Sequence, residues 1–354
     1  MVAALSTGEA DEALLLATAR QGDNDAFNHL TEPYRRELLV YGYRLLGSLQ
    51  DAEDLTQETL LRAWTRLASF AGRSSFRAWL YKIATNTGLN MLAYASRRPA
   101  SMNSSSSARA NSLPSPVATE PIWFEPLLDA HIADLSTTPE ALYSLRESVS
   151  LAFMIALHDL PPHQRATLIL RDVLDWHATE VAEFLEMSVP AVNSALQRAR
   201  ATLATRYHPT GLEAVEAPTL TPTLQALLDR YIQAWETNDV GALMALLKED
   251  ATFSMPPRPQ WYLGRGAIGQ FFQMAVFTQG AGEWRLTPAS ANAQPACVLY
   301  RLNPSTSTYA YFGLMILTID GASIASSIAF VDPALGARYG LTLKFPSAEG
   351  RNES

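Results

Sequence analysis

Residues 171–204 read RDVLDWHATEVAEFLEMSVPAVNSALQRARATLA, which has the pattern of two short helices joined by a tight turn. Apolar residues recur at helical spacing and predict one buried side for each helix: Val181, Ala182, Leu185, Val192, Leu196 and Leu203. Ser188 can cap the second helix, and Pro190 suits its first turn. The stretch therefore predicts a helix–turn–helix.

Charge is divided between the two predicted helices. The first carries Glu180, Glu183 and Glu186, whereas residues 189–206 contain arginines and no acidic residue. A hairpin that only needs solubility would mix charges, but a helix in the major groove needs small polar groups near its start and arginines for phosphates. The DNA contacts we predict are Ser188, Ala191, Asn193, Ser194, Ala195, Gln197, Arg198 and Arg200. A soluble helical hairpin remains the alternative.

The composition limits the class of protein. The chain has 354 residues and a formal net charge of −8, so any binding to DNA must use a local basic surface. The single Cys297 excludes an intramolecular disulfide and a cysteine-rich zinc site, and we expect no cofactor or metal. The amino-terminal residues are acidic, unlike a signal peptide, and the longest apolar run (309–319) is shorter than the roughly 20 residues of a membrane span. We expect a cytoplasmic protein without membrane contact.

Further along the chain, composition divides the sequence into five parts. Residues 10–98 and 139–207 have helical periodicity, and we predict two all-α modules. Residues 99–138 are rich in Ser, Pro and Ala, and residues 208–222 contain several prolines, so both are predicted to be linkers, the first of them flexible. Residues 223–345 begin with an amphipathic helix and continue in strand-like runs, which predicts an α+β domain.

The first helical module contains an acidic stripe in DAEDLTQETLLRAW (51–64). Asp51, Asp54, Glu58 and Leu61 recur three or four residues apart and share one side of a helix. Such a stripe is either a solvated helix face or a docking surface for a basic partner. The stretch alone leaves both open.

The next stretch, FAGRSSFRAWLYKIATNTGLNMLAYASRR (70–98), interleaves aromatic, basic and amide side chains. This mixture suits single-stranded DNA, in which bases stack and phosphates need cations. We expect Phe76 and Trp79 to be core residues, and Asn86 to be the better candidate for a base contact, because a mid-helix Asn gains nothing from helix propensity. The DNA contacts predicted here are Arg73, Arg77, Lys82, Asn86, Asn90, Arg97 and Arg98.

Together these stretches resemble the sigma-70 family of bacterial sigma factors, specifically the extracytoplasmic-function group. The resemblance covers about residues 10–98 and 140–207. It implies that Asp51, Asp54, Gln57 and Glu58 contact core RNA polymerase, whose β′ clamp and β flap would be the partners. It also implies that Asn86 meets the non-template strand of the −10 element in promoter DNA, and that the helix from Val189 reads the −35 element.

Two residues depart from the pattern of that family. Glu186 stands in the turn where Gly or Asn is usual, at a cost of about 1 kcal/mol if the residue takes a positive φ. His177 replaces the usual Ser or Thr opposite Glu180, so we expect an impaired capping box.

Residues 223–345 resemble the SnoaL-like polyketide cyclase fold, a cone-shaped α+β barrel, chiefly through WYLGRGAIGQFF (261–272). In sigma factors that carry such a domain, it is thought to regulate the factor in place of a separate anti-sigma protein. The fold encloses a pocket for a small ligand, and the lining residues we predict are Trp235, Met255, Arg258, Trp261, Tyr262 and Arg265.

The sequence thus predicts an alternative sigma factor whose carboxy-terminal domain modulates its activity, and not an enzyme. A stand-alone helix–turn–helix regulator with a ligand-sensing barrel is one rival, but it would need neither the acidic helix nor the linker at 97–121. A barrel enzyme with a DNA-binding appendage is the other. Enzymes of this fold use a His or Asp for proton transfer, and no His follows Thr223.

Overall fold

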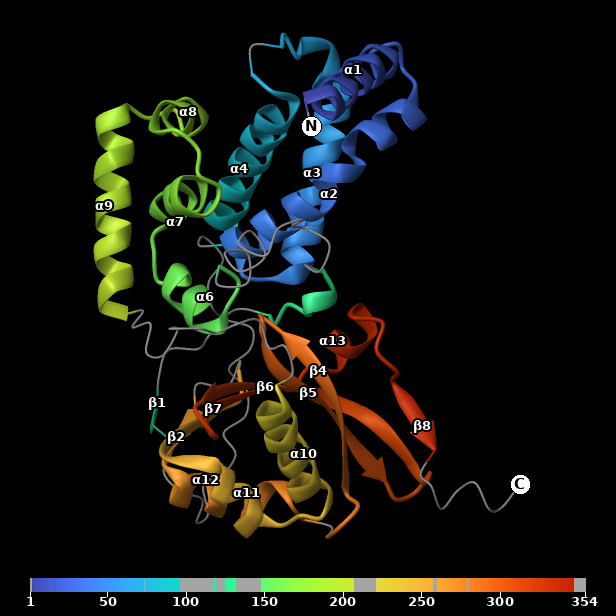
Figure 1. Cartoon of the computed structure of the whole chain (residues 1–354), viewed down its shortest axis with the longest axis vertical. Coiled ribbons are helices and arrows are strands. Elements are labelled where there is room, and N and C mark those ends of the chain that lie inside the picture. Colours follow the sequence, from blue (N-terminus) through green and yellow to red (C-terminus); the bar gives the residue numbers. More distant parts are fainter. Residues whose placement is uncertain are drawn as a thin grey trace. The chain divides into compact units, whose positions relative to one another are not determined.

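The computed structural model describes residues 2–72, 74–95, 117–118, 125–131, 148–206, 221–256, 260–278 and 280–346. The chain forms two compact units (Figure 1). One comprises residues 1–103 and 131–208, and the other comprises residues 104–130 and 209–354. The chain therefore passes from the first unit into the second and back before it enters the second again.

Helices build the first unit. They are α1 (Val2–Ala19), α2 (Asn24–Leu46), α3 (Leu49–Arg66), α4 (Phe76–Ala95), α6 (Leu151–His158), α7 (Pro162–Leu168), α8 (Ala178–Phe184) and α9 (Val189–Arg206). A short 3-10 turn (Leu67–Ser69) follows α3, and a π-helical turn (Ile169–Val173) continues α7. Figure 1 shows α9 alongside α7 and next to α8, as a helix–turn–helix requires.

Side-chain caps and close packing fix α2, α3 and α4. Asp23 accepts a hydrogen bond from the Ala26 amide (2.9 Å) at the start of α2, and Ser48 accepts one from the Asp51 amide (3.1 Å) at the start of α3. At Gly88 in α4, a Cβ atom would lie 2.5 Å from Cδ2 of Leu45. Glycine at this position therefore lets α4 approach α2 closely.

The two predicted helical modules are packed together in this unit. Tyr81 of α4 and Trp176, which precedes α8, have ring centroids 5.2 Å apart. Trp176 in turn meets Phe184 of α8 edge to face at 4.7 Å. Aromatic burial on both sides of the contact gives the modules a shared apolar core.

The turn between α8 and α9 contains a residue with a left-handed backbone. Glu186 has a φ of 53°, in the left-handed region. The Met187 amide donates to the carbonyl of Ala182 (2.9 Å), which is the long hydrogen bond of a Schellman motif. At the other end of α8, the Glu180 carboxylate accepts from the His177 amide (2.8 Å), so this half of the capping box is formed.

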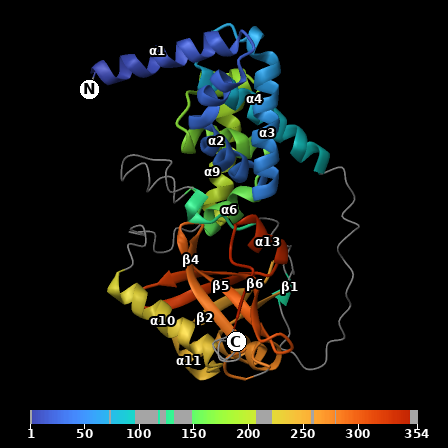
Figure 2. The same cartoon turned by 90° about the vertical axis from the view of Figure 1, so that its right-hand side faces the viewer.

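The second unit is a mixed sheet covered by helices on one face (Figure 2). Its strands are β1 (Val117–Ala118), β2 (Leu247–Ser254), β3 (Gln260–Leu263), β4 (Trp284–Ala291), β5 (Gln294–Asn303), β6 (Thr308–Asp320), β7 (Ser323–Phe330) and β8 (Lys344–Pro346). Its helices are α10 (Pro222–Glu236), α11 (Val240–Leu246), α12 (Arg265–Phe271) and α13 (Pro333–Arg338), and a π-helical turn (Phe272–Val276) extends α12.

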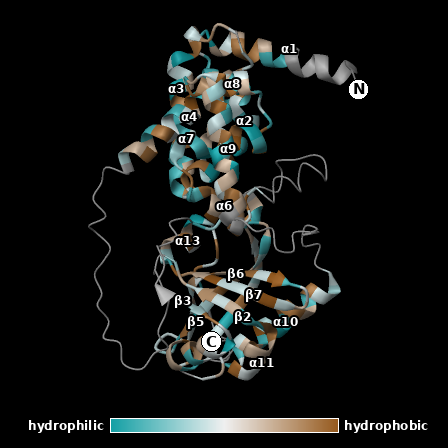
Figure 3. Cartoon of the chain, turned by 90° about the vertical axis from the view of Figure 1, so that its left-hand side faces the viewer, coloured by the Kyte–Doolittle hydropathy of each residue, from teal (hydrophilic) through white to brown (hydrophobic). Residues whose placement is uncertain are grey.

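The strand order is β1-β3-β2-β7-β6-β5-β4, with β8 paired to β6. All pairs are antiparallel except β2 with β7. Hydrophobic residues gather on β6 and β7 at the centre of the sheet (Figure 3). The core between helices and sheet is centred on Trp235, whose ring meets Phe272, Phe277 and Trp284 edge to face at 5.1–5.5 Å.

Part of the predicted flexible linker (99–138) belongs to this second unit, which corrects that expectation. Val117 and Ala118 pair with Trp261 and Gln260 at the β3 edge of the sheet. Residues 125–130 are attached near the other edge, where Leu128 forms a β-bridge with Ala291. We call residues 125–130 the docked segment.

No helix in the described ranges is both long and apolar enough to cross a bilayer.

Candidate nucleic-acid and polymerase interfaces

Helix α3 presents the predicted acidic stripe on its outer side. Its apolar side, which includes Leu49, Leu55 and Leu60, is buried. Asp51, Asp54 and Gln57 are exposed, and Glu58 is half-buried. Leu61, one turn beyond Gln57, is 58% exposed. The stripe is thus an acidic surface that ends in an exposed leucine.

Glu58 connects this stripe to the neighbouring side of α3. Its carboxylate pairs with Arg62 Nε at 2.6 Å, and Arg62 Nη1 donates to Thr87 Oγ1 of α4 at 3.3 Å. Both side chains of the ion pair are about 40% exposed, at 42% and 38%. Solvent therefore screens the pair, which holds Arg62 in place more than it stabilises the fold.

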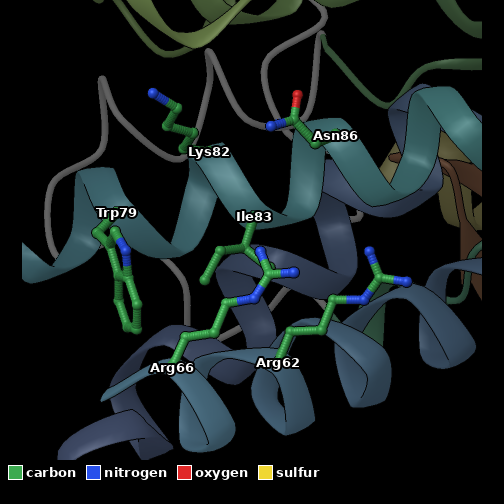
Figure 4. A pocket seen from close by; sticks show the side chains of 6 residues that line it. All are labelled: Arg62, Arg66, Trp79, Lys82, Ile83 and Asn86. Atoms are coloured by element: carbon green, nitrogen blue, oxygen red, sulfur yellow. The ribbon is translucent and has the colours of Figure 1, made fainter. Parts of the chain in front are cut away.

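A pocket of about 160 Å³ lies between α3 and α4. Figure 4 shows Arg62 and Arg66 extending from α3 toward α4, and Trp79, Lys82, Ile83 and Asn86 on α4. Asn86 is exposed, and Lys82 and Trp79 are partly exposed. Three cations, an amide and an indole thus surround one hollow, and this chemistry suits an extruded base with its phosphates.

Arg62 and Arg66 were missed by our sequence analysis, although both belong to this pocket. Their spacing of four residues places them on one side of α3, and this spacing could have indicated a basic surface there. Trp79 lines the pocket as well as packing on Phe70, with ring centroids 5.0 Å apart. Phe76 is 1% exposed and is a core residue, as predicted.

The other basic and amide residues predicted for this module lie elsewhere. Arg77 pairs with Glu37 at 2.8 Å, and its guanidinium lies 5.0 Å from the centre of the Tyr81 ring. Asn90 is exposed on the last turns of α4. Arg73, Arg97 and Arg98 lie outside the described residues.

Helix α9 exposes most of the residues predicted to read DNA. Asn193, Ser194, Gln197 and Arg198 are exposed along one side, and Ser188 accepts a hydrogen bond from the Ala191 amide (3.3 Å) at its start. Ala191 is half-buried. The exposed side presents amide, hydroxyl and guanidinium groups, which are the groups that contact base edges and phosphates.

Two residues of the predicted DNA-reading set have other surroundings. Ala195 is 2% exposed and packs inward, so the prediction that it faces outward is wrong. Arg200 is exposed, but it forms a two-bond ion pair with Asp172 at 2.7 and 2.8 Å. Its charge is therefore partly neutralised before any contact with DNA.

The residues predicted to line a pocket in the carboxy-terminal unit are divided between core and surface. Trp235 and Tyr262 are 2% and 4% exposed and lie in the apolar core, which corrects their placement at a pocket mouth. Met255 and Trp261 are half-buried, and Arg265 is exposed. Arg258 lies outside the described residues. Within the described ranges, no group of three or more His, Cys, Asp or Glu side chains could hold a metal ion.

Three family models match the chain in the order that the sequence predicts. Sigma-70 region 2 matches residues 30–98, Sigma-70 region 4 matches residues 150–203, and the SnoaL-like domain matches residues 228–327. The acidic stripe and the pocket lie in the first range, and α8 and α9 lie in the second.

Curated relatives extend this similarity over nearly the whole chain. The ECF RNA polymerase sigma factor SigG of Mycobacterium tuberculosis is 42% identical over 325 residues, which cover 92% of this chain and 85% of SigG. The RNA polymerase sigma-H factor of Pseudomonas aeruginosa is 29% identical over 194 residues, covering 55% of this chain and 92% of that protein. The crystal structure of the M. tuberculosis extracytoplasmic function sigma factor SigJ superimposes with a TM-score of 0.55 and 23% identity, over 87% of this chain and 97% of SigJ. The likeness to SigJ concerns the fold.

Proposed function

The chain belongs to the extracytoplasmic-function RNA polymerase sigma factors, and on that premise we propose how its surfaces divide promoter-specific initiation among them. It is a transcription initiation factor and not an enzyme. The acidic stripe of α3 would bind core polymerase, the α3–α4 pocket and α9 would contact the promoter, and the carboxy-terminal unit would modulate both.

The polymerase contact is assigned to Asp51, Asp54, Gln57 and Glu58, with the β′ clamp as partner. Exposed carboxylates on one helix side favour a basic partner surface and speed its encounter. The exposed Leu61 adds an apolar contact at the end of the stripe. In such an interface the leucine would supply burial, while the acids would set orientation.

The −10 contact is assigned to the pocket between α3 and α4. Asn86 would hydrogen-bond a base of the non-template strand, and Trp79 would offer a stacking surface. Lys82, Arg62 and Arg66 would neutralise the phosphates around that base. The observation in support is that these groups, from two helices, line one pocket.

The −35 contact is assigned to α9 through Asn193, Ser194, Gln197 and Arg198, with the β flap holding the module in the holoenzyme. These residues share the exposed side of α9. Gln suits a bidentate contact with adenine, and Arg suits guanine or a phosphate. Ala195 is excluded from the contact by its burial.

The carboxy-terminal unit would modulate the factor through the docked segment. Leu127 and Asn292 exchange hydrogen bonds, from the Leu127 amide to Asn292 Oδ1 (2.9 Å) and from the Asn292 amide to the Leu127 carbonyl (2.7 Å). Asp129 accepts from the Ala293 amide at 2.9 Å. Because the docked segment lies in the sequence between the −10 and −35 modules, its attachment restricts how freely they separate.

The exposed acidic stripe is the single observation that carries the proposal, and capture of core RNA polymerase tests it. Asp54→Arg should reduce polymerase capture by the full chain by roughly tenfold or more, because it places a cation against a basic partner. Glu32→Arg is the matched control, since Glu32 is an exposed acid of α2 outside the stripe. Equal capture by wild type and Asp54→Arg would overturn the assignment of the stripe.

A further inference from the structure

Helix α3 carries both the acidic stripe and part of the pocket, and Glu58 lies where the two meet. The stripe passes through Asp54, Glu58 and Leu61 at helical spacing. A second row, with residues four apart, passes from Glu58 through Arg62 to Arg66. Both arginines line the pocket between α3 and α4. Glu58 is therefore a member of the acidic stripe and a neighbour of the pocket at the same time.

The polar side chains that line the pocket differ in whether they are paired. Arg66, Lys82 and Asn86 have no side-chain hydrogen bond or ion pair within the described ranges. Arg62 is the exception, because its Nε donates to the Glu58 carboxylate at 2.6 Å. Two cations of the pocket are thus available to an anion, while the third is already paired with an acid.

Arg62 is held from two sides by groups that differ in their access to solvent. On α4, Thr87 is 4% exposed, and its hydroxyl accepts from Arg62 Nη1 at 3.3 Å. On α3, the Glu58 side chain is 42% exposed, so a partner surface can reach it. A competitor that binds the Glu58 carboxylate would leave Arg62 beside the pocket, still bonded to Thr87, with its Nε free to donate elsewhere.

The charge that the pocket offers to DNA depends on this ion pair. While Glu58 offsets Arg62, the pocket has the two uncompensated charges of Arg66 and Lys82, and loss of the pairing adds a third. A larger positive charge strengthens binding to phosphates. Because both members of the pair are partly exposed, the pair itself is weak, and either a phosphate or a basic protein surface can compete with it.

We propose that Glu58 is a positioning residue for the pocket, and that its ion pair with Arg62 couples the pocket to the acidic stripe. A basic surface of polymerase that binds the Glu58 carboxylate strengthens the binding of Arg62 to a phosphate of the −10 strand. A phosphate bound to Arg62 in turn frees Glu58 for polymerase, since coupling between two sites is reciprocal. The inference rests on the proposed function, which assigns polymerase to the stripe and the strand to the pocket.

Two variants of the full chain, Glu58→Gln and Arg62→Gln, test the coupling. Strand affinity is measured with a short fluorescent single-stranded oligonucleotide of mixed sequence, and polymerase affinity by capture of core enzyme without DNA. Glu58→Gln should bind the strand about two- to fivefold more tightly and capture less polymerase, because competition with an exposed ion pair has this magnitude. Arg62→Gln should bind the strand more weakly and capture polymerase about two- to fivefold more tightly.

The opposite changes in the two assays separate coupling from a structural role, since a variant that only loosened α3 would lower both affinities. Glu58→Gln should also steepen the salt dependence of strand binding by about 0.7 unit of slope, because one more phosphate is neutralised. Glu53→Gln is the matched control. Glu53 is a half-buried acid of α3 outside the stripe, without a hydrogen bond or ion pair in the described part of the chain. It should leave both affinities close to those of wild type.

The double variant decides whether the ion pair is responsible. In an Arg62→Gln chain, adding Glu58→Gln should raise strand affinity no more than adding Glu53→Gln does. A larger gain, or an Arg62→Gln chain that captures no more polymerase than wild type, would overturn the coupling. If Arg66→Gln leaves strand affinity unchanged, or the chain binds no strand, the proposed −10 contact fails. The comparison of polymerase capture then still decides whether Arg62 competes for Glu58.

Discussion

His158 is buried where its protonation opposes the packing of the two helical modules. Its Nε2 atom is buried without a hydrogen-bond partner in the described part of the chain. Burial, and then the charge of Arg165, lower the pKa of the imidazole to about 3, while its bond to the Arg44 backbone acts in the opposite sense. The charged groups that face it are Arg165 and Arg44, and Asp159 follows it in the chain. The folded chain therefore holds a neutral His158.

The free energy of unfolding should consequently fall in mild acid. In the unfolded chain the imidazole regains an ordinary pKa of about 6.5, so its contribution to stability is fully present above that pH and is lost as the pH falls toward 3. The linkage predicts that this group lowers the folded-to-unfolded ratio about tenfold between pH 7.5 and 5.5. Denaturant unfolding of the full chain over this pH range measures it.

His158→Gln is the control for this prediction. Glutamine can donate a hydrogen bond to the Arg44 backbone but does not titrate. A variant whose stability falls with pH as steeply as that of wild type would assign the effect to another group.

Glu186 stores backbone strain in the turn of the helix–turn–helix. Its φ of 53° costs a non-glycine residue about 1 kcal/mol. Glu186→Gly should relieve up to about 1 kcal/mol and slow amide exchange of α8 and α9 up to roughly fivefold. Hydrogen-exchange mass spectrometry of the full chain reads this directly. Glu183→Gly, within α8, should accelerate exchange instead, because glycine inside a helix is destabilising.

The sequence left the φ of Glu186 open, although the Gly or Asn that is usual there in the family was a signal for the positive value that the structure has. The burial of Ala195 was mispredicted from the same stretch. Ala195 is small enough to be read as a surface residue that allows close approach, but its helical phase groups it with Val192 and Ala199, which are fully buried. Periodicity was the better guide here than residue size.

At the scale of elements, α9 offers two arginines that differ in their readiness to bind phosphate. Arg198 is exposed, whereas Arg200 is held by Asp172 at 2.7 and 2.8 Å. Arg198→Ala should weaken promoter binding by the holoenzyme and reduce its salt dependence by about one unit of slope, because one phosphate contact is lost. Arg200→Ala should have the smaller effect. Promoter affinity measured across a salt series compares them.

Asp172 provides the complementary change. Asp172→Asn releases Arg200 without removing a side chain, so it should raise affinity at low salt and steepen the salt dependence. If Arg200→Ala weakened binding as much as Arg198→Ala, or if Asp172→Asn had no effect, the ion pair would not control Arg200.

The helices α3 and α4 show why part of the site could not be predicted from sequence. The acidic stripe could be read from one helix, since residues three or four apart share a side. The pocket needs two helices and their crossing. In the sequence Arg62 and Arg66 look like ordinary charges of α3, but in the structure they line the same pocket as Trp79, Lys82 and Asn86 of α4. The periodicity of one helix shows which of its residues share a side, but it does not show which other helix packs against that side.

At the scale of the whole molecule, the order of parts along the chain could be predicted, but their grouping could not. The two helical modules join in one unit through buried polar groups, such as Arg165, which in a sequence look like surface charges. The linker at 99–138 has the composition of a flexible segment, yet Leu127 within it is completely buried. The short apolar run around Leu127 was the available signal that this part of the linker is buried. Its partner could not be predicted, because Asn292 lies more than 160 residues further along the chain.

Asn292 allows the role of the docked segment to be tested in the intact factor. The residue lies in the turn between β4 and β5 with a φ of 53°, which glycine adopts freely. Asn292→Gly therefore keeps the turn and removes the bond from the Leu127 amide, a loss of about 1–2 kcal/mol. Amide exchange of the docked segment should accelerate roughly tenfold. Asn303→Gly, at the exposed last residue of β5, is the control.

The functional consequence follows from the position of the docked segment between the modules. Wild type should transcribe best from promoters within a narrow range of −10 to −35 spacings. While the docked segment is attached, only the linker residues on either side of it can change the distance between the two modules. Asn292→Gly should broaden that range, while Asn303→Gly should not. In vitro transcription with core polymerase over promoters of graded spacing measures this. Asn292→Gly could accelerate amide exchange of the docked segment and still leave the dependence of transcription on promoter spacing unchanged. That result would show that attachment of the segment does not limit the distance between the modules. The carboxy-terminal unit would then have to act through another surface.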